Sequence, residues 1–102
     1  MYARISQWRY RHGTIDEATR IIRDIMIPGA NKQPGFKGAF ILKHDADPDK
    51  HTIISLWESK ADLLASRPPE EIIPLLAPLD DYIIENIQDT CDVLLSLHNN
   101  DQ

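Results

Sequence analysis

The pattern of apolar and polar residues is clearest between positions 34 and 66, where two strands, a turn and a helix follow one another. Residues 36–44 and 51–57 are rich in β-branched and aromatic side chains, which is typical of β-strands. The segment between them, Asp-Ala-Asp-Pro-Asp-Lys, has the composition of a turn. Ser59 can then cap a helix, because an acidic residue follows three positions later. This part of the chain predicts a β-hairpin that leads directly into a helix.

Neither strand of this hairpin alternates cleanly between apolar and polar residues. In the first strand, Phe36, Phe40 and Leu42 share one face by simple alternation, while Ile41 lies on the other, and the second strand also has apolar residues on both faces. A sheet with one face in water should show a clean alternation. We therefore expect both faces to be covered, the second one by a ligand cavity, a partner subunit or both.

The N-terminal third predicts a strand followed by an amphipathic helix. Residues 2–11 alternate between two mixed faces, as a strand does. Thr14 and Glu17 have the spacing of a capping box, and apolar residues then recur at intervals of three and four. Pro28 and Gly29 are expected to end this helix.

The C-terminal third predicts a broken helical segment and a last strand. Residues 70–79 have helical periodicity but contain prolines that forbid one regular helix. Residues 80–86 fit neither pattern, and residues 89–98 alternate as a strand does. We expect a single domain over residues 1–98, followed by a polar tail at 99–102.

The predicted order of elements is β-α-β-β-α-β. The economical fold for this order is a ferredoxin-like α+β sandwich, in which both helices cover one face of an antiparallel four-stranded sheet. The helices leave the other, partly apolar face bare, so a homodimer formed sheet against sheet is predicted. Burying several hundred Å² of such surface would contribute on the order of 10 kcal/mol before association costs.

Composition and charge exclude several classes of protein. The chain has 102 residues and a net charge of −5, and residues 58–102 hold ten acidic side chains against two basic ones. A nucleic-acid-binding protein would need a basic footprint, so none is expected. No apolar run is long enough to span a membrane, and the start lacks the features of a signal peptide. A cytoplasmic location is expected.

Two motifs resemble a known family. Pro-Gly-Phe at 34–36 and Leu-Trp-Glu-Ser-Lys-Ala-Asp-Leu at 56–63 are similar to the pattern of the antibiotic biosynthesis monooxygenase-like family, in the dimeric α+β barrel superfamily. The resemblance implies that the glycine-phenylalanine pair opens the second strand and that Trp57 ends the third. It also implies two sheets that close into a barrel across a two-fold axis.

The resemblance leaves the activity open between two readings. The superfamily includes cofactor-independent quinone-forming monooxygenases, haem-degrading enzymes, isomerases and many proteins with no assigned reaction. The first reading is a monooxygenase that needs no cofactor and acts on a small aromatic or polyketide-like substrate. The second is a non-catalytic or unassigned dimeric module, because no acid-base constellation or nucleophile motif is visible in the sequence.

Haem degradation is not supported. In the haem-degrading members, the tryptophan that corresponds to Trp57 works with an asparagine on the first strand and a histidine on the following helix. This chain has Ser6, Gln7 and Trp8 in the first-strand region and no histidine between Lys60 and Leu97. Trp57 is better explained as a packing residue at the corner between strand and helix.

Aromatic residues provide the candidates for a binding site for a small apolar or aromatic ligand. A pocket for a flat ligand needs apolar surface of this kind, although packing in the core would use the same side chains. No residue is assigned a catalytic role. The pocket candidates are Trp8, Tyr10, Phe40, His44, Trp57 and Tyr82.

The hairpin turn invites a metal interpretation, because His44 and His51 flank three aspartates. The acidic spacing is similar to the start of an EF-hand loop, but that loop needs a glycine and a glutamate where this chain has Lys50 and Leu56. A solvated turn explains the aspartates, and no metal site is predicted. Either histidine could act as a base if a pocket opened beside it.

Overall fold

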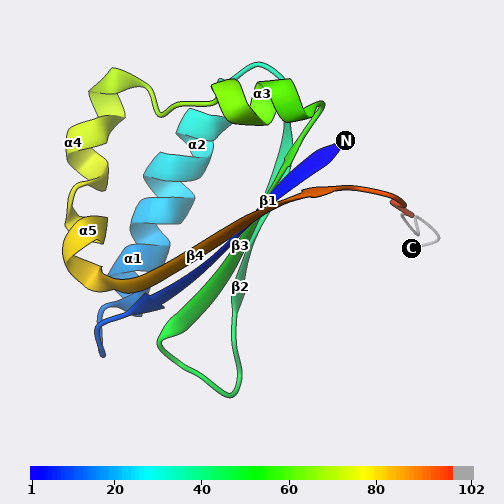
Figure 1. The fold of residues 1–102 in the computed structure, drawn as a ribbon. Helices are drawn as coiled ribbons and strands as arrows, with labels where there is room; N and C mark the ends of the chain where they lie inside the picture. The colour runs from blue at the N-terminus through cyan, green and yellow to red at the C-terminus, as the bar shows by residue number, and fades with distance from the viewer. Residues whose placement is uncertain (98–102) are drawn as a thin grey trace, which may run out of the picture.

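The computed structural model describes residues 1–97 and confirms the βαββαβ order (Figure 1). Two further segments, η1 and η2, are a π-helix and a 3₁₀-helix. The elements are β1 Tyr2–Tyr10, α1 Ile15–Ile21, η1 Ile22–Met26, α2 Ile27–Ala30, β2 Phe36–Lys43, β3 Lys50–Trp57, α3 Lys60–Ala65, η2 Glu70–Ile72, α4 Ile73–Leu76, α5 Pro78–Tyr82 and β4 Ile83–Asp92.

The four strands form one antiparallel sheet in the order β2-β3-β1-β4. All of the helices lie on one side of this sheet, as Figure 1 shows. The predicted ferredoxin-like α+β fold is therefore confirmed. Among the described residues, no helix is long and apolar enough to cross a membrane.

The core lies between the sheet and the first helical segment. Ala18, Ile21 and Ile22 are at most 1% exposed, and they pack against Trp8 and Tyr10 of β1. The helix presents these residues at intervals of three and four, so one stripe faces the sheet. The amphipathic pattern predicted for this helix is thus the pattern that builds the core.

The first helical segment runs further than predicted. The sequence suggested that Pro28 and Gly29 end it, but α2 contains both and continues to Ala30. The segment widens into a π-turn at η1, and the Ile27 N–H donates to the carbonyl of Ile22, five residues back. The π-turn lies directly before Pro28, where a regular α-helix would lose one hydrogen bond and the ring would clash with the carbonyl four residues back.

The two predicted helix caps have different outcomes. The prediction of a capping box at Thr14 is wrong. The Thr14 hydroxyl donates to the Arg11 carbonyl, and Glu17 pairs with Arg20 instead. At Ser59 the cap is confirmed. Its hydroxyl oxygen accepts the Asp62 N–H at 3.1 Å, and the hydroxyl donates to the Asp62 carboxylate at 3.0 Å.

The faces of β2 differ from the simple alternation. A bulge between Phe36 and Gly38 shifts the register against β3, and Gly38 has a positive φ of 151°. The extra residue moves Phe36 to the helix-facing side, where its ring meets Trp57 edge to face with centroids 5.3 Å apart. Phe40 stays on the opposite face. The prediction that both share one face was wrong because a bulge inverts the parity of the residues before it.

The C-terminal third agrees with prediction in its helices but not in its strand. The broken helical segment is confirmed as η2, α4 and α5. The last strand was predicted at residues 89–98, but β4 spans Ile83–Asp92, so the ambiguous residues at its start belong mostly to the strand. Residues 93–97 continue without regular structure. The predicted polar tail at 99–102 lies outside the described residues.

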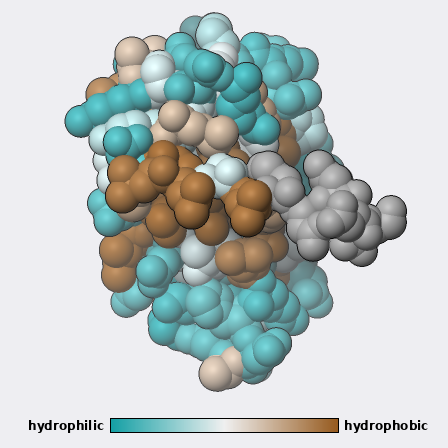
Figure 2. Space-filling model, turned by 90° about the vertical axis from the view of Figure 1, so that its right-hand side faces the viewer, coloured by the Kyte–Doolittle hydropathy of each residue, from teal (hydrophilic) through white to brown (hydrophobic). Residues whose placement is uncertain are grey.

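The side of the sheet away from the helices is partly apolar, with Gln7, Thr52 and Asp89 on the same face. Figure 2 shows a hydrophobic band across this bare face, with hydrophilic surface above and below it. Strand register places Phe40, Ile54 and Ile5 in one cross-strand row and Leu56 beside Ala3 in the next, and Phe40 and Ile87 are each 55% exposed. We call this surface the outer apolar face; it consists of Ala3, Ile5, Phe40, Leu42, Ile54, Leu56 and Ile87.

Candidate functional site

A pocket of about 250 Å³ lies between the sheet and the helices. Its size is close to the lower end of small-molecule sites, which span about 300–1,000 Å³. One wall is the helix-facing side of the sheet, and the opposite wall comes from η1, α2, α4 and the segment after α3. We call it the main pocket; it is lined by Arg4, Ser6, Trp8, Met26, Ile27, Ala30, Gln33, Phe36, Ile53, Ser55, Trp57, Ser66, Arg67, Pro68, Ile72, Leu76 and Gln88.

Trp57 is held rigidly at one end of the main pocket. It is 3% exposed, and its indole N–H donates to the hydroxyl of Ser55 at 3.0 Å. The ring of Phe36 packs against it. Gly35, just before Phe36, has a φ of 79°, and its carbonyl accepts the Glu58 N–H at 2.7 Å. The Pro-Gly-Phe motif thus aligns the start of β2 with the end of β3.

Trp8 divides the main pocket from a second hollow of about 320 Å³. Both spaces share Trp8, Met26 and Leu76 in their linings. The Trp8 indole N–H donates to the side-chain oxygen of Asn86 on β4 at 2.7 Å. This bond fixes the orientation of the ring, and with it the wall between the two spaces.

Of the six pocket candidates from the sequence, Trp8 and Trp57 line the main pocket. Tyr10 is fully buried in the core, and Tyr82 packs against that core from α5. Phe40 belongs to the outer apolar face, and His44 follows the end of β2, where its Nε2 lies 2.6 Å from the Thr52 hydroxyl oxygen. The fold therefore brings together two of the six.

His51 lies in a buried chain of hydrogen bonds outside the pocket. Its Nδ1 is 2.8 Å from the Tyr10 hydroxyl, and its Nε2 is 3.1 Å from the Thr19 hydroxyl. Because Thr19 donates to the Ile15 carbonyl at 2.7 Å, it accepts from His51 Nε2–H, and Nδ1 accepts from Tyr10. Burial, together with the charges of Lys43 and His44, lowers the pKa of His51 from 6.5 to about 4. Burial also raises the pKa of Tyr10.

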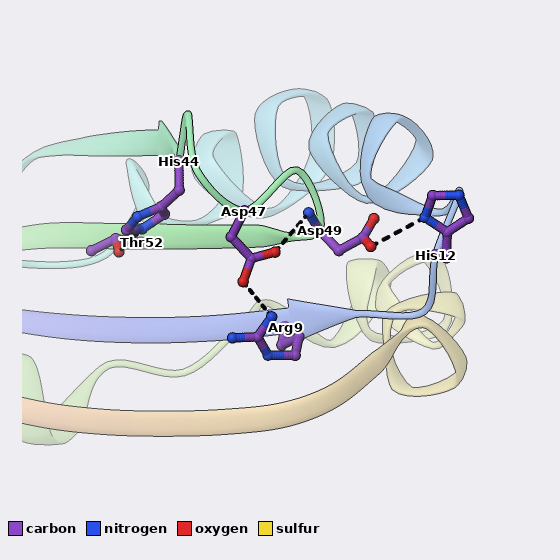
Figure 3. A network of polar contacts seen from close by, with 6 residues as sticks. All are labelled: Arg9, His12, His44, Asp47, Asp49 and Thr52. Carbon is purple, nitrogen blue, oxygen red and sulfur yellow. Dashed lines mark hydrogen bonds and ion pairs between the residues drawn. The ribbon is translucent and has the colours of Figure 1, made fainter.

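The polar side chains of the hairpin turn do not converge on one point. Figure 3 shows Asp47 directed at Arg9, Asp49 at His12, and His44 at Thr52. The hydrogen bond from Arg9 keeps the pKa of Asp47 below its usual value. Among the described residues, no group of three or more histidine, cysteine, aspartate or glutamate side chains could hold a metal ion. Asp47 and Asp49 instead anchor the turn to Arg9 and His12.

Several polar residues of the main pocket were missed by the sequence reasoning. Arg4 and Ser6 lie on the same face of β1 as Trp8, so strand alternation alone would have indicated them. Gln88 was missed because it precedes the range predicted for the last strand. Its place opposite Ser6 follows from the register of β1 and β4, which no local pattern shows.

The lining of the main pocket limits its chemistry. No histidine, aspartate, glutamate, cysteine, lysine or tyrosine of the described residues lines it. Its polar groups are the hydroxyls of three serines, two side-chain amides and two guanidinium groups. Such a site can bind, orient and shield a flat apolar ligand, and it can donate hydrogen bonds to that ligand. It has no side chain suited to remove a proton near neutral pH.

Structural comparison finds solved proteins with the same fold. A proposed antibiotic biosynthesis monooxygenase from Nitrosomonas europaea has a TM-score of 0.79 and 15% identity, covering 91% of this chain and 89% of its own. A protein of unknown function from the same organism has a TM-score of 0.76 and 15% identity, with coverages of 96% and 93%. The cofactor-independent oxygenase SnoaB from Streptomyces nogalater has a TM-score of 0.73 and 13% identity, with coverages of 96% and 97%.

Comparison with families is more specific. The search of curated proteins gives no match, and the identities to the solved structures above show only the shared fold. The family description "Antibiotic biosynthesis monooxygenase" matches residues 1–71. This match includes both motifs singled out in the sequence and most of the main pocket. The chain belongs to the antibiotic biosynthesis monooxygenase family.

Proposed function

We propose that this protein is a cofactor-independent monooxygenase that oxidises a small aromatic or polyketide-like substrate in the main pocket. The observation that carries the proposal is an apolar chamber walled by two tryptophan rings whose indole N–H groups are each hydrogen-bonded. Such a chamber suits a substrate whose own carbanion supplies the electrons that reduce O₂. The family match and the fold shared with an enzyme described as a cofactor-independent oxygenase support the same conclusion.

The chemistry balances without a further reductant. A substrate CH₂ group between activating rings or carbonyls loses one proton, and the carbanion passes an electron to O₂. The resulting radical pair combines to form a C–O bond, and protonation gives a hydroperoxide. Loss of water, with departure of the second C–H proton, leaves a carbonyl. The net reaction converts CH₂ and O₂ into C=O and H₂O. The protein's residues bind the flat anion and exclude bulk water from it.

The proposal predicts oxygen uptake with anthrones or related phenolic substrates. One O₂ should disappear for each quinone formed, measured with an oxygen electrode and by absorbance. Trp57→Leu should lower kcat/KM about tenfold, because it removes the ring that faces the ligand. Tyr82→Phe is the matched aromatic control outside the pocket and should change kcat/KM by less than about twofold. Circular dichroism checks that both variants fold.

The alternative is a dimeric module that binds a ligand without turning it over. The lack of a proton-accepting side chain in the described lining favours it. The two readings separate in the same experiment. Binding of the phenolic ligands without oxygen uptake across a broad panel would support the module and contradict the monooxygenase.

We also propose that two copies of the chain associate through the outer apolar face. Two cross-strand rows bring its central apolar side chains together, and Phe40, Leu42 and Ile87 on the edge strands are about half exposed in the single chain. A patch of this kind on a lone subunit would promote aggregation. Pairing two such faces buries the patch and leaves the main pocket, on the other side of the sheet, open to ligand.

The proposed dimer predicts the mass of the protein in solution. Sedimentation equilibrium at micromolar concentration should give twice the chain mass of 11.7 kDa. Dilution should shift the mass toward the single chain only well below that concentration, since apolar burial of this extent outweighs the cost of association. A mass of 11.7 kDa that does not rise on concentrating would contradict the dimer.

A further inference from the structure

The main pocket carries positive charge in an acidic protein. Arg4 and Arg67 line it, and no carboxylate of the described residues does, although the whole chain has a net charge of −5. Asp92 lies opposite Tyr2 and so on the same face of the sheet as Arg4, but it does not line the pocket. The pocket is therefore locally cationic.

The guanidinium of Arg4 uses little of its hydrogen-bonding capacity on the described residues. It makes one hydrogen bond within residues 1–97, a long one of 3.5 Å from Nη2 to the Leu63 carbonyl. An arginine side chain has five N–H donors. Neither Arg4 nor Arg67 forms an ion pair with any described residue, whereas Arg9, Arg20 and Arg23 do. A half-buried arginine with free donors inside an apolar pocket is suited to an acidic ligand.

We propose that the main pocket takes its ligand as an anion, with an ionised oxygen of a flat aromatic or polyketide-like molecule bound to Arg4. This inference rests on the proposed function and narrows its substrate class to molecules that carry a carboxylate or an ionisable phenol or enol. The apolar body of the ligand then lies between Trp8 and Trp57, which flank Arg4 along the lining. Arg67, at the exposed edge, attracts the anion into the pocket.

The assignment also explains how a pocket without a base can favour a deprotonated substrate. A guanidinium within hydrogen-bond distance stabilises the ionised form of an acidic group and lowers its pKa. The effect is larger in an apolar chamber than in water because the effective dielectric constant is lower. The proton can then leave to solvent, and no side chain has to accept it. Arg4 does not accept that proton; it lowers the free energy of the deprotonated substrate, which reduces the need for a side-chain base.

Two probes of equal shape and different charge test the inference. Isothermal titration calorimetry would compare 2-naphthoate with 2-naphthamide on the full chain near neutral pH. The anion should bind at least about tenfold more tightly, which is the usual gain from a hydrogen bond to a charged group. The preference should shrink as the ionic strength rises from about 0.05 to about 0.5 M.

Variants of the arginines locate the effect. Arg4→Met should reduce the preference for the anion to about twofold or less, and Arg4→Lys should keep part of it as a point charge. Arg67→Met should weaken it less, because that side chain is exposed. Arg23→Met removes the same charge from the surface, where Arg23 pairs with Asp24, and should leave the preference unchanged.

The outcomes separate the two proposals. If both probes bind the wild type equally, the proposal that the main pocket binds a flat ligand is kept, and the proposal that it prefers an anion is wrong. If the anion is preferred but Arg4→Met and Arg23→Met behave alike, the preference comes from elsewhere and the assignment of Arg4 is wrong. If neither probe binds and no phenolic substrate is turned over, the proposed function fails, and this inference fails with it.

Discussion

Replacing Ile54 with aspartate is expected to convert the proposed dimer into a monomer. Ile54 lies in the middle of the outer apolar face, directly between Phe40 of β2 and Ile5 of β1. In a sheet-to-sheet dimer a carboxylate here would be buried without a partner, and burying an unpaired charge costs several kcal/mol. The dissociation constant should rise by a factor of about 100 or more. Sedimentation equilibrium would measure the shift from twice 11.7 kDa to 11.7 kDa.

The control for this variant is Ile54→Val, which keeps a β-branched apolar side chain and should keep the dimer. Circular dichroism would check that the monomeric Ile54→Asp variant retains its helices and strands. Ile54 faces away from the core, so the fold does not depend on it directly. A folded Ile54→Asp protein that remains dimeric would place the interface somewhere other than the outer apolar face.

Acid is expected to destabilise this protein through His51 well before most carboxylates titrate. The imidazole is 1% exposed and accepts a hydrogen bond from Tyr10, which requires the neutral form. Its pKa falls from 6.5 in the unfolded chain to about 4 in the folded protein. A lowered pKa in the folded state means that its stabilising effect is complete above pH 6.5 and is lost as the pH falls toward 4.

The expected loss is about 2 to 3 kcal/mol of unfolding free energy between about pH 7.5 and 4.5, from the size of the pKa shift. Urea denaturation at a series of pH values would measure it. His51→Gln provides the matched control, because an amide can still donate and accept hydrogen bonds but does not titrate. Its stability should depend less on pH over this range. Equal slopes for the wild type and His51→Gln would show that His51 does not carry the effect.

Local sequence rules were sufficient where neighbouring residues alone decide the structure. The hairpin depends on two β-rich runs and a turn between them, although the bulge between Phe36 and Gly38 shifts its register at the far end. The cap at Ser59 needs only an acid three residues away. The same rules failed at Thr14, because its hydroxyl found a carbonyl partner in the turn before the helix.

Tertiary packing overrode local signals at two places. The first helix continues through Pro28, directly after a π-turn, because its apolar stripe is buried against the sheet. The last strand begins at Ile83 because β1 offers an unpaired edge opposite residues 83–92. No window of sequence contains that edge, which comes from a strand about 80 residues earlier.

The sequence by itself determined the order of elements, the antiparallel α+β fold, the two motifs of the family and an apolar second face of the sheet. These follow from periodicity and turn chemistry, which act between residues close in the chain. Only the tertiary structure decided that Trp8 and Trp57 share a pocket while Tyr10, Phe40, His44 and Tyr82 do not. It also decided that Arg4 lies in that pocket and that no carboxylate among residues 1–97 lines it. The reason is that a pocket is made where register, a bulge and helix packing place distant residues together, and each of these depends on contacts across the whole sheet.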